Sequence, residues 1–294
     1  MRKIFLFFVV LVTVVQSSCY AQLSDIARVD YTYIPESNSS IGYNRIRVLF
    51  NAPIKLKKES TYLFLGLDYS NINLKIEDSS IDNRELSDFQ LLDLNIGYTT
   101  PLKNNWRIGV RFSPGISSNL SAKEVGFGDI VFSGDLVFIK DEKEDEGVKK
   151  PWRLITGLSY SGNRGFPFPL PFISYYKKFH KKWSYNLGIP KTNIQYHVSN
   201  RQRLKLLAEL DGFTSNLQQG IVLEDNTIAE SINMSLILGS LQYEYHIAKH
   251  VEFFAKSSLI LSNNVRLRDD NRDNIRELDN SNTIYLRTGI RLKI

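Results

Sequence analysis

Apolar and polar side chains alternate along most of this chain, which has almost no helical periodicity. Because successive side chains of a β-strand point to opposite faces, this pattern predicts strands with one apolar and one polar face. In residues 106–113, Trp, Ile, Val and Phe alternate with Arg, Gly, Arg and Ser. Similar stripes cover 62–69, 92–99 and 203–211. Each is about the length of a strand that crosses a bilayer.

The stripes predict an all-β fold, specifically a transmembrane antiparallel up-and-down β-barrel. Its strands are expected at 26–34, 44–52, 61–72, 89–100, 105–113, 128–140, 151–161, 169–179, 183–189, 193–199, 202–214, 231–247, 251–265 and 282–294, fourteen in all. The hairpin over 183–199 has short strands, and twelve strands is the alternative if it is not part of the wall. The count is even either way, as expected for such a barrel.

The connections alternate between short and long. Short polar turns are expected at 101–104, 180–182, 200–201 and 248–250, and long segments rich in Asn, Asp and Ser at 73–87, 114–127, 215–230 and 266–280. Outer-membrane barrels combine short periplasmic turns with longer extracellular loops, whereas a soluble sandwich has no reason to sort its loops in this way. Two connections do not fit: 141–150 is long for a turn and 190–192 is short for a loop.

The last residues alternate down to the carboxyl terminus. Ile284, Leu286 and Ile290 fall on one face of a strand, and Arg287 and Arg291 on the other. We therefore expect the strand at 282–294 to pair with the first strand and close the barrel. Outer-membrane barrels usually end on an aromatic residue, whereas this chain ends on Ile.

Residues 1–21 predict a secretory signal peptide. Arg2 and Lys3 precede an apolar run at 4–15, and Ala21 is a small residue at the expected cleavage site. This run is shorter than the roughly 20 residues that a membrane-spanning helix needs. A lipoprotein signal at Cys19 is the alternative, which Gln16 disfavours because such signals have an aliphatic residue there. Residues 22–294 are then expected to form one barrel domain in a bacterial outer membrane.

Cleavage would change the composition of the mature chain. Cys19 is the only cysteine, so no thiol would remain for a disulfide, a nucleophile or a metal site. Arg2 and Lys3 would be lost with no acidic residue, which lowers the formal net charge from +6 to +4. The basic residues are spread along the chain, so no nucleic-acid partner is expected.

If the apolar stripes face lipid, the charged residues that alternate with them line the lumen. The candidate lumen-lining residues are Arg45, Arg47, Asp93, Arg107, Arg111, Arg203, Lys205, Glu209, Lys256, Arg287 and Arg291. A barrel of 12 to 14 strands is wide enough to hold water. Charges of both signs allow a polar channel with weak attraction for anions, or a lumen that ion pairs seal. The sequence leaves both open.

A proline-rich aromatic segment leads to a family resemblance. Residues 165–172 read Gly-Phe-Pro-Phe-Pro-Leu-Pro-Phe, followed by Ile-Ser-Tyr-Tyr-Lys-Lys, and residues 187–190 read Leu-Gly-Ile-Pro. From Trp152 to about Gly212, and more loosely along the mature chain, the sequence resembles an uncharacterised family of Gram-negative outer-membrane β-barrels, known only as a domain of unknown function. The resemblance implies a barrel and no particular activity. Pro167, Pro169 and Pro171 cannot donate ladder hydrogen bonds, so the strand here is expected to begin after them.

Aromatic residues at strand ends are typical of a membrane interface. Trp106, Trp152 and Trp183 each open a strand just after a predicted periplasmic turn. We expect them to form part of an interfacial girdle. Core positions in a sandwich are the alternative.

The sequence predicts no catalytic, cofactor or metal site and no enzyme. Its four histidines, His180, His197, His246 and His250, fall at the predicted periplasmic side, the wrong rim for a hydrolase of outer-leaflet lipid. The chain has no Gly-x-Ser-x-Gly motif and no metal-ligand spacing of histidines. The carboxylates at 141–146 are interleaved with lysine, at Lys140 and Lys143, which is typical of a solvated turn.

The sequence therefore predicts an outer-membrane barrel that is structural or a porin-like small-solute channel. Expected partners are outer-membrane lipid, the barrel-assembly machinery during insertion and a small polar solute. One alternative is a secreted or surface β-protein that binds an external partner through long loops such as 266–280. Another is a soluble β-sandwich binding protein.

Overall fold

The computed structural model describes residues 25–36, 41–76, 85–122, 124–142, 151–279 and 282–293. The predicted signal peptide and its Cys19, parts of the connections at 73–87 and 141–150, and the terminal Ile lie outside these residues. The strands are β1 (Ala27–Ile34), β2 (Ile41–Lys55), β3 (Tyr62–Ile76), β4 (Phe89–Pro101), β5 (Trp106–Ser118), β6 (Ile130–Asp141), β7 (Trp152–Ser161), β8 (Leu170–Lys178), β9 (Trp183–Ile189), β10 (Lys191–His197), β11 (Gln202–Val222), β12 (Ile228–His246), β13 (Val251–Arg268), β14 (Asn274–Asp279) and β15 (Ile284–Leu292). A short 3-10 helix, η2 (Phe127–Asp129), precedes β6. In the part of the chain that is described, no helix is long and apolar enough to cross a membrane.

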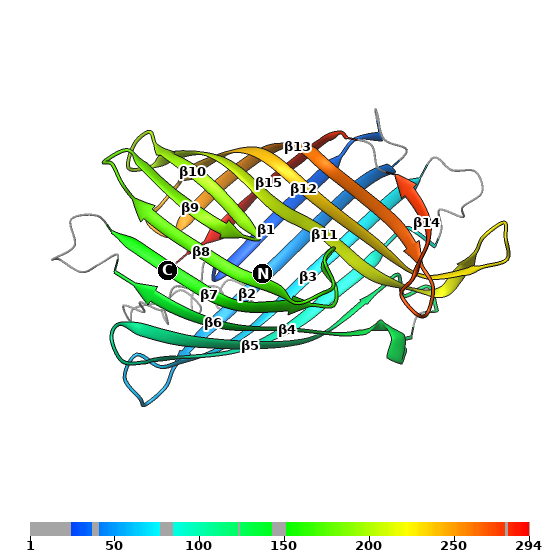
Figure 1. Cartoon of the computed structure of the whole chain (residues 1–294), viewed down its shortest axis with the longest axis horizontal. Coiled ribbons are helices and arrows are strands. Elements are labelled where there is room, and N and C mark those ends of the chain that lie inside the picture. The colour runs from blue at the N-terminus through cyan, green and yellow to red at the C-terminus, as the bar shows by residue number, and fades with distance from the viewer. Residues whose placement is uncertain are drawn as a thin grey trace, which may run out of the picture.

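The described strands form a closed antiparallel barrel (Figure 1). Each strand from β1 to β13 pairs with the next, β13 pairs with β15, and β15 pairs with β1. The sheet has 15 strands in the described residues, and β14 pairs with β13 alone, so the ring has fourteen. The predicted count of fourteen is confirmed. The hairpin over 183–199 is part of the wall, because β9 pairs with β8 and β10 with β11.

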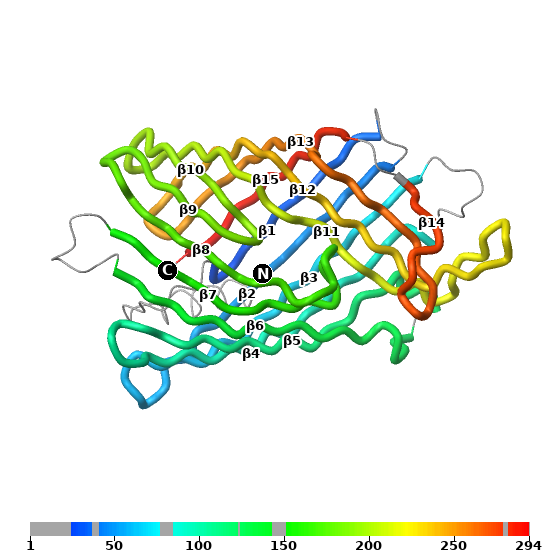
Figure 2. The backbone as a smooth tube through the Cα atoms, in the orientation of Figure 1, coloured from blue at the N-terminus to red at the C-terminus, as the bar shows by residue number. Residues whose placement is uncertain are grey.

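The two ends of the barrel differ. At the end that we call the turn end, β1 begins and β15 finishes side by side, with Ala27 opposite Leu292. The short connections 102–105, 179–182, 198–201 and 247–250 lie at this end. At the opposite, loop end, the β11–β12 hairpin and β14 extend beyond the other strands (Figure 2). The predicted closure of the last strand on the first is confirmed.

The two faces of the wall differ in polarity as the alternation predicts. On β5, Val110 and Phe112 are 46% and 50% exposed, whereas Ser113, which points into the barrel, is 1% exposed. The same contrast holds on β15, where Leu286 and Ile290 are exposed and Tyr285 is buried. Exposed apolar side chains therefore cover the outside of the barrel.

Aromatic residues gather at the turn end of the wall. Trp106, Trp152 and Trp183 are the first residues of β5, β7 and β9, as predicted. The Nζ of Lys140 lies 5.8 Å from the Trp106 ring centroid and 5.9 Å from that of Trp152. The Trp183 and Tyr196 rings are 4.8 Å apart. This arrangement suits a boundary where rings need an apolar and a wet side.

Toward the loop end the barrel becomes narrower, because β11 crosses to β5. Beyond the start of β6, Asn216 of β11 pairs with Ser118 of β5 in parallel, and the Asn119 N–H donates to the Asn216 carbonyl at 3.2 Å. Strands β6–β10 end on the turn-end side of this contact. We call the contact between Asn216 and Ser118 the β5–β11 junction. The ring above it consists of β1–β5, β11–β13 and β15.

Asp129 of η2 holds the junction together. Its carboxylate accepts hydrogen bonds from the Asn216 and Gln218 side-chain amides, both at 2.6 Å, and from the Gly126 N–H at 2.8 Å. Burial alone would raise the pKa of Asp129, but these hydrogen bonds outweigh burial and lower the pKa below its usual value. The ionised carboxylate therefore stabilises the junction.

An apolar core fills the narrow part of the barrel. It consists of the inward-facing residues Ile34, Ile41, Tyr43, Ile72, Leu74, Ile76, Leu86, Phe89, Leu91, Phe213, Leu217, Ile221, Leu223, Ala229, Ile232, Met234, Leu236, Leu238, Ile260, Val265, Leu267 and Tyr285. Phe213 of β11 packs against Phe89 and Tyr43 of the opposite wall, with ring centroids 5.6 and 6.1 Å apart. The two walls thus meet as in a sandwich, and the loop end of the lumen is filled.

The predicted long loops are partly strand. β5 continues through Pro114 to Ser118, β11 and β12 extend to Val222 and from Ile228, and β14 lies within the predicted loop 266–280. These predictions of loop were wrong because pairing continues above the apolar outer stripe, where the polar composition resembles that of a loop.

The prediction that β8 begins after all three prolines was also wrong. β8 begins at Leu170 and includes Pro171, opposite Leu158 of β7. The Lys178 N–H points toward β7, so by alternation the nitrogen of Pro171 faces β9. The uppermost pair of β8 with β9 is Ile173 with Ile189. Pro171 lies beyond it, where the ladder needs no donor.

A glycine at position 212 allows β11 to bend inward. Its φ is +133°, a conformation that side chains disfavour, and a Cβ there would collide with the Met234 carbonyl oxygen. We expect Gly212→Ala to lower the free energy of unfolding by about 1–3 kcal/mol, measured by urea unfolding in lipid vesicles. Gly239→Ala is the matched control on β12, because its Cβ would meet only the flexible Leu261 side chain, at 3.2 Å. Equal effects of the two substitutions would contradict the bend.

Asp129→Asn should loosen the β5–β11 junction, because an amide cannot accept both sets of hydrogen bonds. We expect a loss of about 1.5–3 kcal/mol of local stability, seen as faster amide hydrogen exchange at 119–129. Since the folded pKa is lowered, the stabilisation in the wild type is present above the unfolded carboxyl pKa of about 3.9 and is lost as the pH falls through the folded pKa. An unchanged acid response in Asp129→Asn would show that another group is responsible.

Candidate functional site: the barrel interior

The interior below the apolar core is polar, and its charges form layers. At the turn end, Glu244 and Glu252 are fully buried. Arg203 donates to Glu252 at 2.5 Å and lies 3.1 Å from Glu244, and Arg291 binds both carboxylates at 2.6 Å. Lys205 contacts Glu244 at 2.6 Å. Strands β11, β12, β13 and β15 are thus joined through the lumen.

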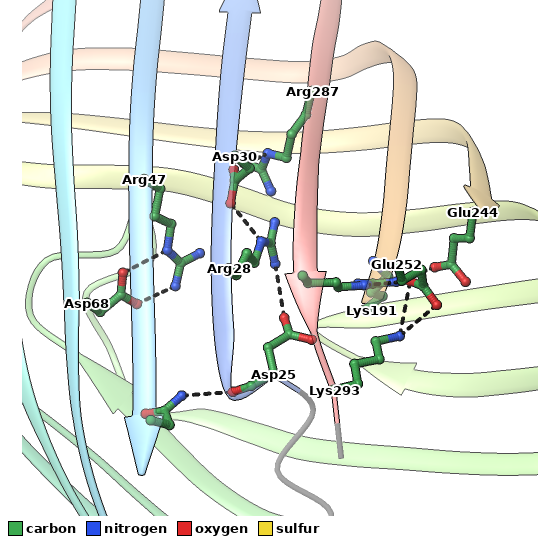
Figure 3. A network of polar contacts seen from close by, with 12 residues as sticks. Asp25, Arg28, Asp30, Arg47, Asp68, Lys191, Glu244, Glu252, Arg287 and Lys293 are labelled. Atoms are coloured by element: carbon green, nitrogen blue, oxygen red, sulfur yellow. Dashed lines mark hydrogen bonds and ion pairs between the residues drawn. The ribbon is translucent and has the colours of Figure 1, made fainter. Parts of the chain in front are cut away.

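Charged residues at the end of β15 and on β1 continue this layer (Figure 3). Lys293 lies 3.1 Å from Glu252, and Arg28 of β1 lies between Asp25 and Asp30. The guanidinium groups of Arg28 and Arg291 lie 5.0 and 5.1 Å from the Phe254 ring centroid.

The next layers lie closer to the middle of the barrel. Glu209 of β11 accepts hydrogen bonds from Lys256 and, at 2.8 Å, from Lys191. Above it, Asp211 pairs with Arg287 and lies 3.5 Å from Arg45. The Tyr285 hydroxyl donates to Asp211 at 2.6 Å. We call these layers, from Glu244 to Asp211, the charge ladder.

The inner face of β11 shows how the sequence divides the lumen. Arg203, Lys205, Glu209 and Asp211 face inward below the bend at Gly212, and Phe213 begins the apolar core above it. Isolated buried charges would cost several kcal/mol each. Each carboxylate of the ladder contacts at least one cation, which offsets this cost.

A polar cavity of about 230 Å³ lies between the charge ladder and the apolar core. Inward-facing charged groups of β2–β5 and β11 line it, among them Arg47, Asp68, Asp93, Arg111 and Asp211. Arg47 donates to Asp68 at 2.8 Å (Figure 3). Such a space can hold about eight waters at liquid density, or part of a small solute.

Hydroxyl and amide groups complete the polar wall of the cavity. Arg111 donates to Asp135 at 2.6 Å and to Asn95 at 3.3 Å, and Ser159 donates to Asp135 at 2.5 Å. Asn163 donates to Asp93 at 2.8 Å. The cavity therefore offers charged, donor and acceptor groups within one enclosure.

The structure places all of the candidate lumen-lining residues that the sequence suggests. Six of them line the cavity: Arg45, Arg47, Asp93, Arg111, Glu209 and Arg287. Arg203, Lys205, Lys256 and Arg291 belong to the charge ladder. Arg107 lies apart from both, and donates to the Ser60 carbonyl of the β2–β3 turn at 2.7 Å.

Sequence reasoning missed the contribution of the β7–β8 connection. Asn163, Arg164, Phe166 and Phe168 all line the cavity. They follow no strand periodicity, so alternation could not assign them to a face. The glycine and prolines at 165–171 are the sequence signal of an unusual backbone path here.

One histidine has a partner that the sequence did not suggest. The Nε2 of His197 lies 2.9 Å from the Oγ of Ser184. A serine nucleophile needs such a base, but Ser184 is 0% exposed, so no substrate reaches its hydroxyl in this conformation. The pair stabilises the β9–β10 hairpin instead. Among the described residues, no group of three or more His, Cys, Asp or Glu side chains could hold a metal ion.

Comparison with known families identifies the chain as a member of one of them. The family described as domain of unknown function DUF6268 matches residues 17–293. The chain belongs to this family. The likeness suggested by the segment around residues 165–190 is thereby confirmed. No curated protein matches the chain.

Several solved structures are distantly similar. The NanC porin is 8% identical, with a TM-score of 0.39, and the match covers 91% of this chain and 100% of that one. The translocator domain of the autotransporter NalP from Neisseria meningitidis is 9% identical, with a TM-score of 0.38 and coverage of 98% and 95%. The toluene transporter TodX from Pseudomonas putida is 10% identical, with a TM-score of 0.33 and coverage of 91% and 87%.

Glu244→Gln should strongly destabilise the turn end of the barrel, because it leaves Arg203, Lys205 and Arg291 with one buried carboxylate fewer. Breaking a buried ion pair on one side costs about 3–5 kcal/mol. Urea unfolding in lipid vesicles measures the change. Glu224→Gln, at an exposed position in the β11–β12 hairpin, is the matched control and should change stability by less than about 0.5 kcal/mol. Similar midpoints for the two variants would contradict a structural role for the ladder.

Proposed function

We propose that the protein is an outer-membrane β-barrel that takes a small solute into its central cavity. It works as a porin-like channel whose loop end, the extracellular end, is closed in this conformation. The turn end faces the periplasm. The observation that supports this proposal is the position of the cavity between the charge ladder and the apolar core.

The outer surface supports a place in a membrane. Large apolar side chains are exposed on strand after strand; examples are Val29, Ile46, Leu67, Leu94, Phe112, Leu158, Leu206 and Leu259. A water-soluble protein rarely exposes so much contiguous apolar surface. In lipid, where unpaired backbone groups are costly, a closed ring is one of the two structures that can span the bilayer. The predicted signal peptide agrees with export.

The contents of the lumen support a solute path that is closed at one end. The cavity lies in the middle of the barrel, with the charge ladder toward the turn end and the apolar core toward the loop end. Paired charges keep a polar interior hydrated at moderate cost, whereas the apolar core excludes water. A solute that reaches the cavity therefore meets its barrier at the core.

The same geometry gives no support to catalysis, and we propose a role without chemistry. Arg47 and Arg111 in the cavity are engaged in ion pairs with Asp68 and Asp135, and the Ser184–His197 pair lies inside the wall.

The proposal predicts that the wild type is silent in planar lipid bilayers and that opening the core creates a pore. In Phe213→Ala/Leu217→Ala, two fully buried side chains of the core are shortened, and discrete conductance steps should follow. Leu259→Ala/Leu261→Ala makes a comparable truncation on the exposed outer face and should stay silent. Heat-modifiable gel migration confirms that both variants fold.

The same recordings contain the outcomes that contradict the proposal. A large steady current through the wild type would show that the loop end is open. If the folded core variant stays silent, the barrel has no solute path through the core. The loop end would then be tested for binding of an external partner. Failure of the wild type to insert into lipid would exclude the membrane barrel.

In the opened variant, Arg111→Gln should shift the ion selectivity toward cations. The substitution removes one positive charge from the cavity wall and leaves Asp135 without its guanidinium partner. The reversal potential under a salt gradient measures the shift. Lys75→Gln, an exposed substitution near Glu36, should leave it unchanged, and an equal shift in both variants would place the selective region outside the cavity.

A further inference from the structure

The barrel wall has a low section beside β11. The uppermost pair between β10 and β11 is Lys191 with Glu209, whereas β11 continues to Val222. Above Glu209, the Leu210 N–H donates to the Pro190 carbonyl at 3.1 Å and the Thr214 N–H to the Asn163 carbonyl at 2.9 Å. No strand lies between these two contacts in the part of the chain that is described. We call this gap the notch.

The Gly212 N–H, in the middle of the notch, is satisfied locally. It donates to the Oδ1 of Asp211 at 2.8 Å. A backbone donor away from water needs a partner, and here the Asp211 side chain supplies it, beside Gly165 of the β7–β8 connection, which packs against Gly212. The notch thus interrupts the backbone hydrogen bonds between strands without leaving the Gly212 N–H unpaired.

Apolar groups surround the notch. They are Phe166, Phe168, Leu170, Pro171, Phe172, Pro190 and Leu210, and all of them line the cavity. Phe168 is 52% exposed and packs edge-on against Phe166, with ring centroids 6.3 Å apart. By strand alternation, Pro171 and Leu210 belong to the outer face of the wall.

One cavity therefore contacts both faces of the barrel. Arg47, Asp68 and Arg111 line its inner, polar part, whereas Pro171 and Leu210 of the outer face line its other part. At the notch the cavity thus reaches the wall itself, beside Leu210 and the β7–β8 connection. Its volume of about 230 Å³ is below the roughly 300–1,000 Å³ of sites that enclose a whole drug-sized ligand, so a ligand in it would extend through the notch.

Arg164 supplies an unused charge at this place. It lines the cavity, and its side chain is accessible to solvent. Arg111 and Arg47 repel it, and Asp135 and Asp68 attract it, but these two carboxylates already bind Arg111 and Arg47. Among the described residues, no ion-pair or hydrogen-bond partner contacts its guanidinium group.

The carboxylates of the cavity offer no comparable group that a ligand can reach. Glu209 and Asp211 belong to the charge ladder. Asp93 accepts a hydrogen bond from Asn163 through Oδ2. Its Oδ1 has no hydrogen-bond partner, but it is buried beside Gly115, where a ligand does not reach it. The charge that a ligand can reach in the cavity is therefore positive. A planar guanidinium with five donors matches a carboxylate.

We propose that the notch is a lateral entrance from the membrane, and that the cavity binds single-chain amphiphiles with a carboxylate head. The head binds Arg164, and the acyl chain lies between Phe166, Phe168 and Leu210 and extends into the bilayer. This inference rests on the proposed function in one respect, which is that the barrel is embedded in lipid.

Quenching of tryptophan fluorescence by a brominated fatty acid tests the proposal. The full barrel is folded into phosphatidylcholine vesicles as the variant Phe168→Trp, and the wild type reports the background of Trp106, Trp152 and Trp183. Bromine quenches only at short range. We expect a saturable component of quenching at position 168, on top of the linear component from fatty acid dissolved in the bilayer.

Control variants separate binding from partition into the membrane. Ile173→Trp places the fluorophore on the exposed outer face of β8 and should show the linear component alone. Arg164→Gln in the Phe168→Trp background should weaken the saturable component tenfold or more, because a charge-assisted hydrogen bond is lost, and Arg164→Lys should restore part of it. The brominated methyl ester, which has no anionic head, should bind equally weakly to all variants.

The result that overturns the proposal is a saturable component that is absent, or that Arg164→Gln and the methyl ester leave unchanged. Competition by butyrate, a carboxylate without a long chain, distinguishes the source of the ligand. Full displacement at similar concentrations would show that the site serves small anions from water and would exclude the lateral entrance. Weak or no displacement supports entry from the bilayer.

The bilayer recordings and the quenching experiment can fail separately. If the core variant stays silent but saturable quenching is present, the barrel binds amphiphiles without passing solutes. If the core variant conducts and the quenching is linear, the proposed function stands and the lateral site is excluded.

Discussion

Pairing of β1 with β15 is the constraint on which the rest of the structure depends. It joins the two ends of the sheet at the turn end, with Ala27 opposite Leu292 and Tyr33 opposite Leu286. A closed ring leaves no free edge between its first and last strands, so its outside can be apolar and its inside can be charged. In an open sheet of this sequence, the exposed leucines would face water and the buried carboxylates would lose their partners on the opposite strands.

Ring closure also determines how the interior is divided. Strand β11 carries charges on its inner face up to Asp211, bends at Gly212 and continues with Phe213 into the apolar core. Below the bend, the lumen is wide enough for ion pairs between strands that are not neighbours, such as Arg203 with Glu252. Above the bend, β11 reaches β5 and the lumen is too narrow for anything but packed side chains. The cavity lies where these two regimes meet.

The bend leaves a gap in the wall that the β7–β8 connection partly fills. This connection carries Asn163 and Arg164 to the cavity and ends in the proline-rich aromatic segment at the notch. The features that make the barrel unlike an open pore therefore share one origin, which is that β11 leaves β10 after Glu209.

Alternation in the sequence predicted the ring and its fourteen strands, with twelve as the alternative. It worked for residues such as Arg47, Arg111 and Leu206 because the side-chain period of a strand is independent of its partners. It could not predict the crossing of β11 to β5, because Asn216 and Ser118 are far apart in the chain and polar residues mark loops and strand extensions alike. Arg164 was missed because it lies in a connection, where no period relates sequence to direction. The choice between an open and a paired lumen needed the distances between side chains.

Cross-linking of the first and last strands in lipid-inserted protein tests ring closure most directly. With Cys19 removed, Val29→Cys/Ile290→Cys places two thiols at register partners, and a short bifunctional thiol reagent should join them within one chain, seen as a shift in gel migration. The pair Val29→Cys/Leu286→Cys is displaced by four residues, about 13 Å along the strand, and should not react. Efficient cross-linking of the displaced pair, or of neither pair in folded protein, would contradict the closed barrel.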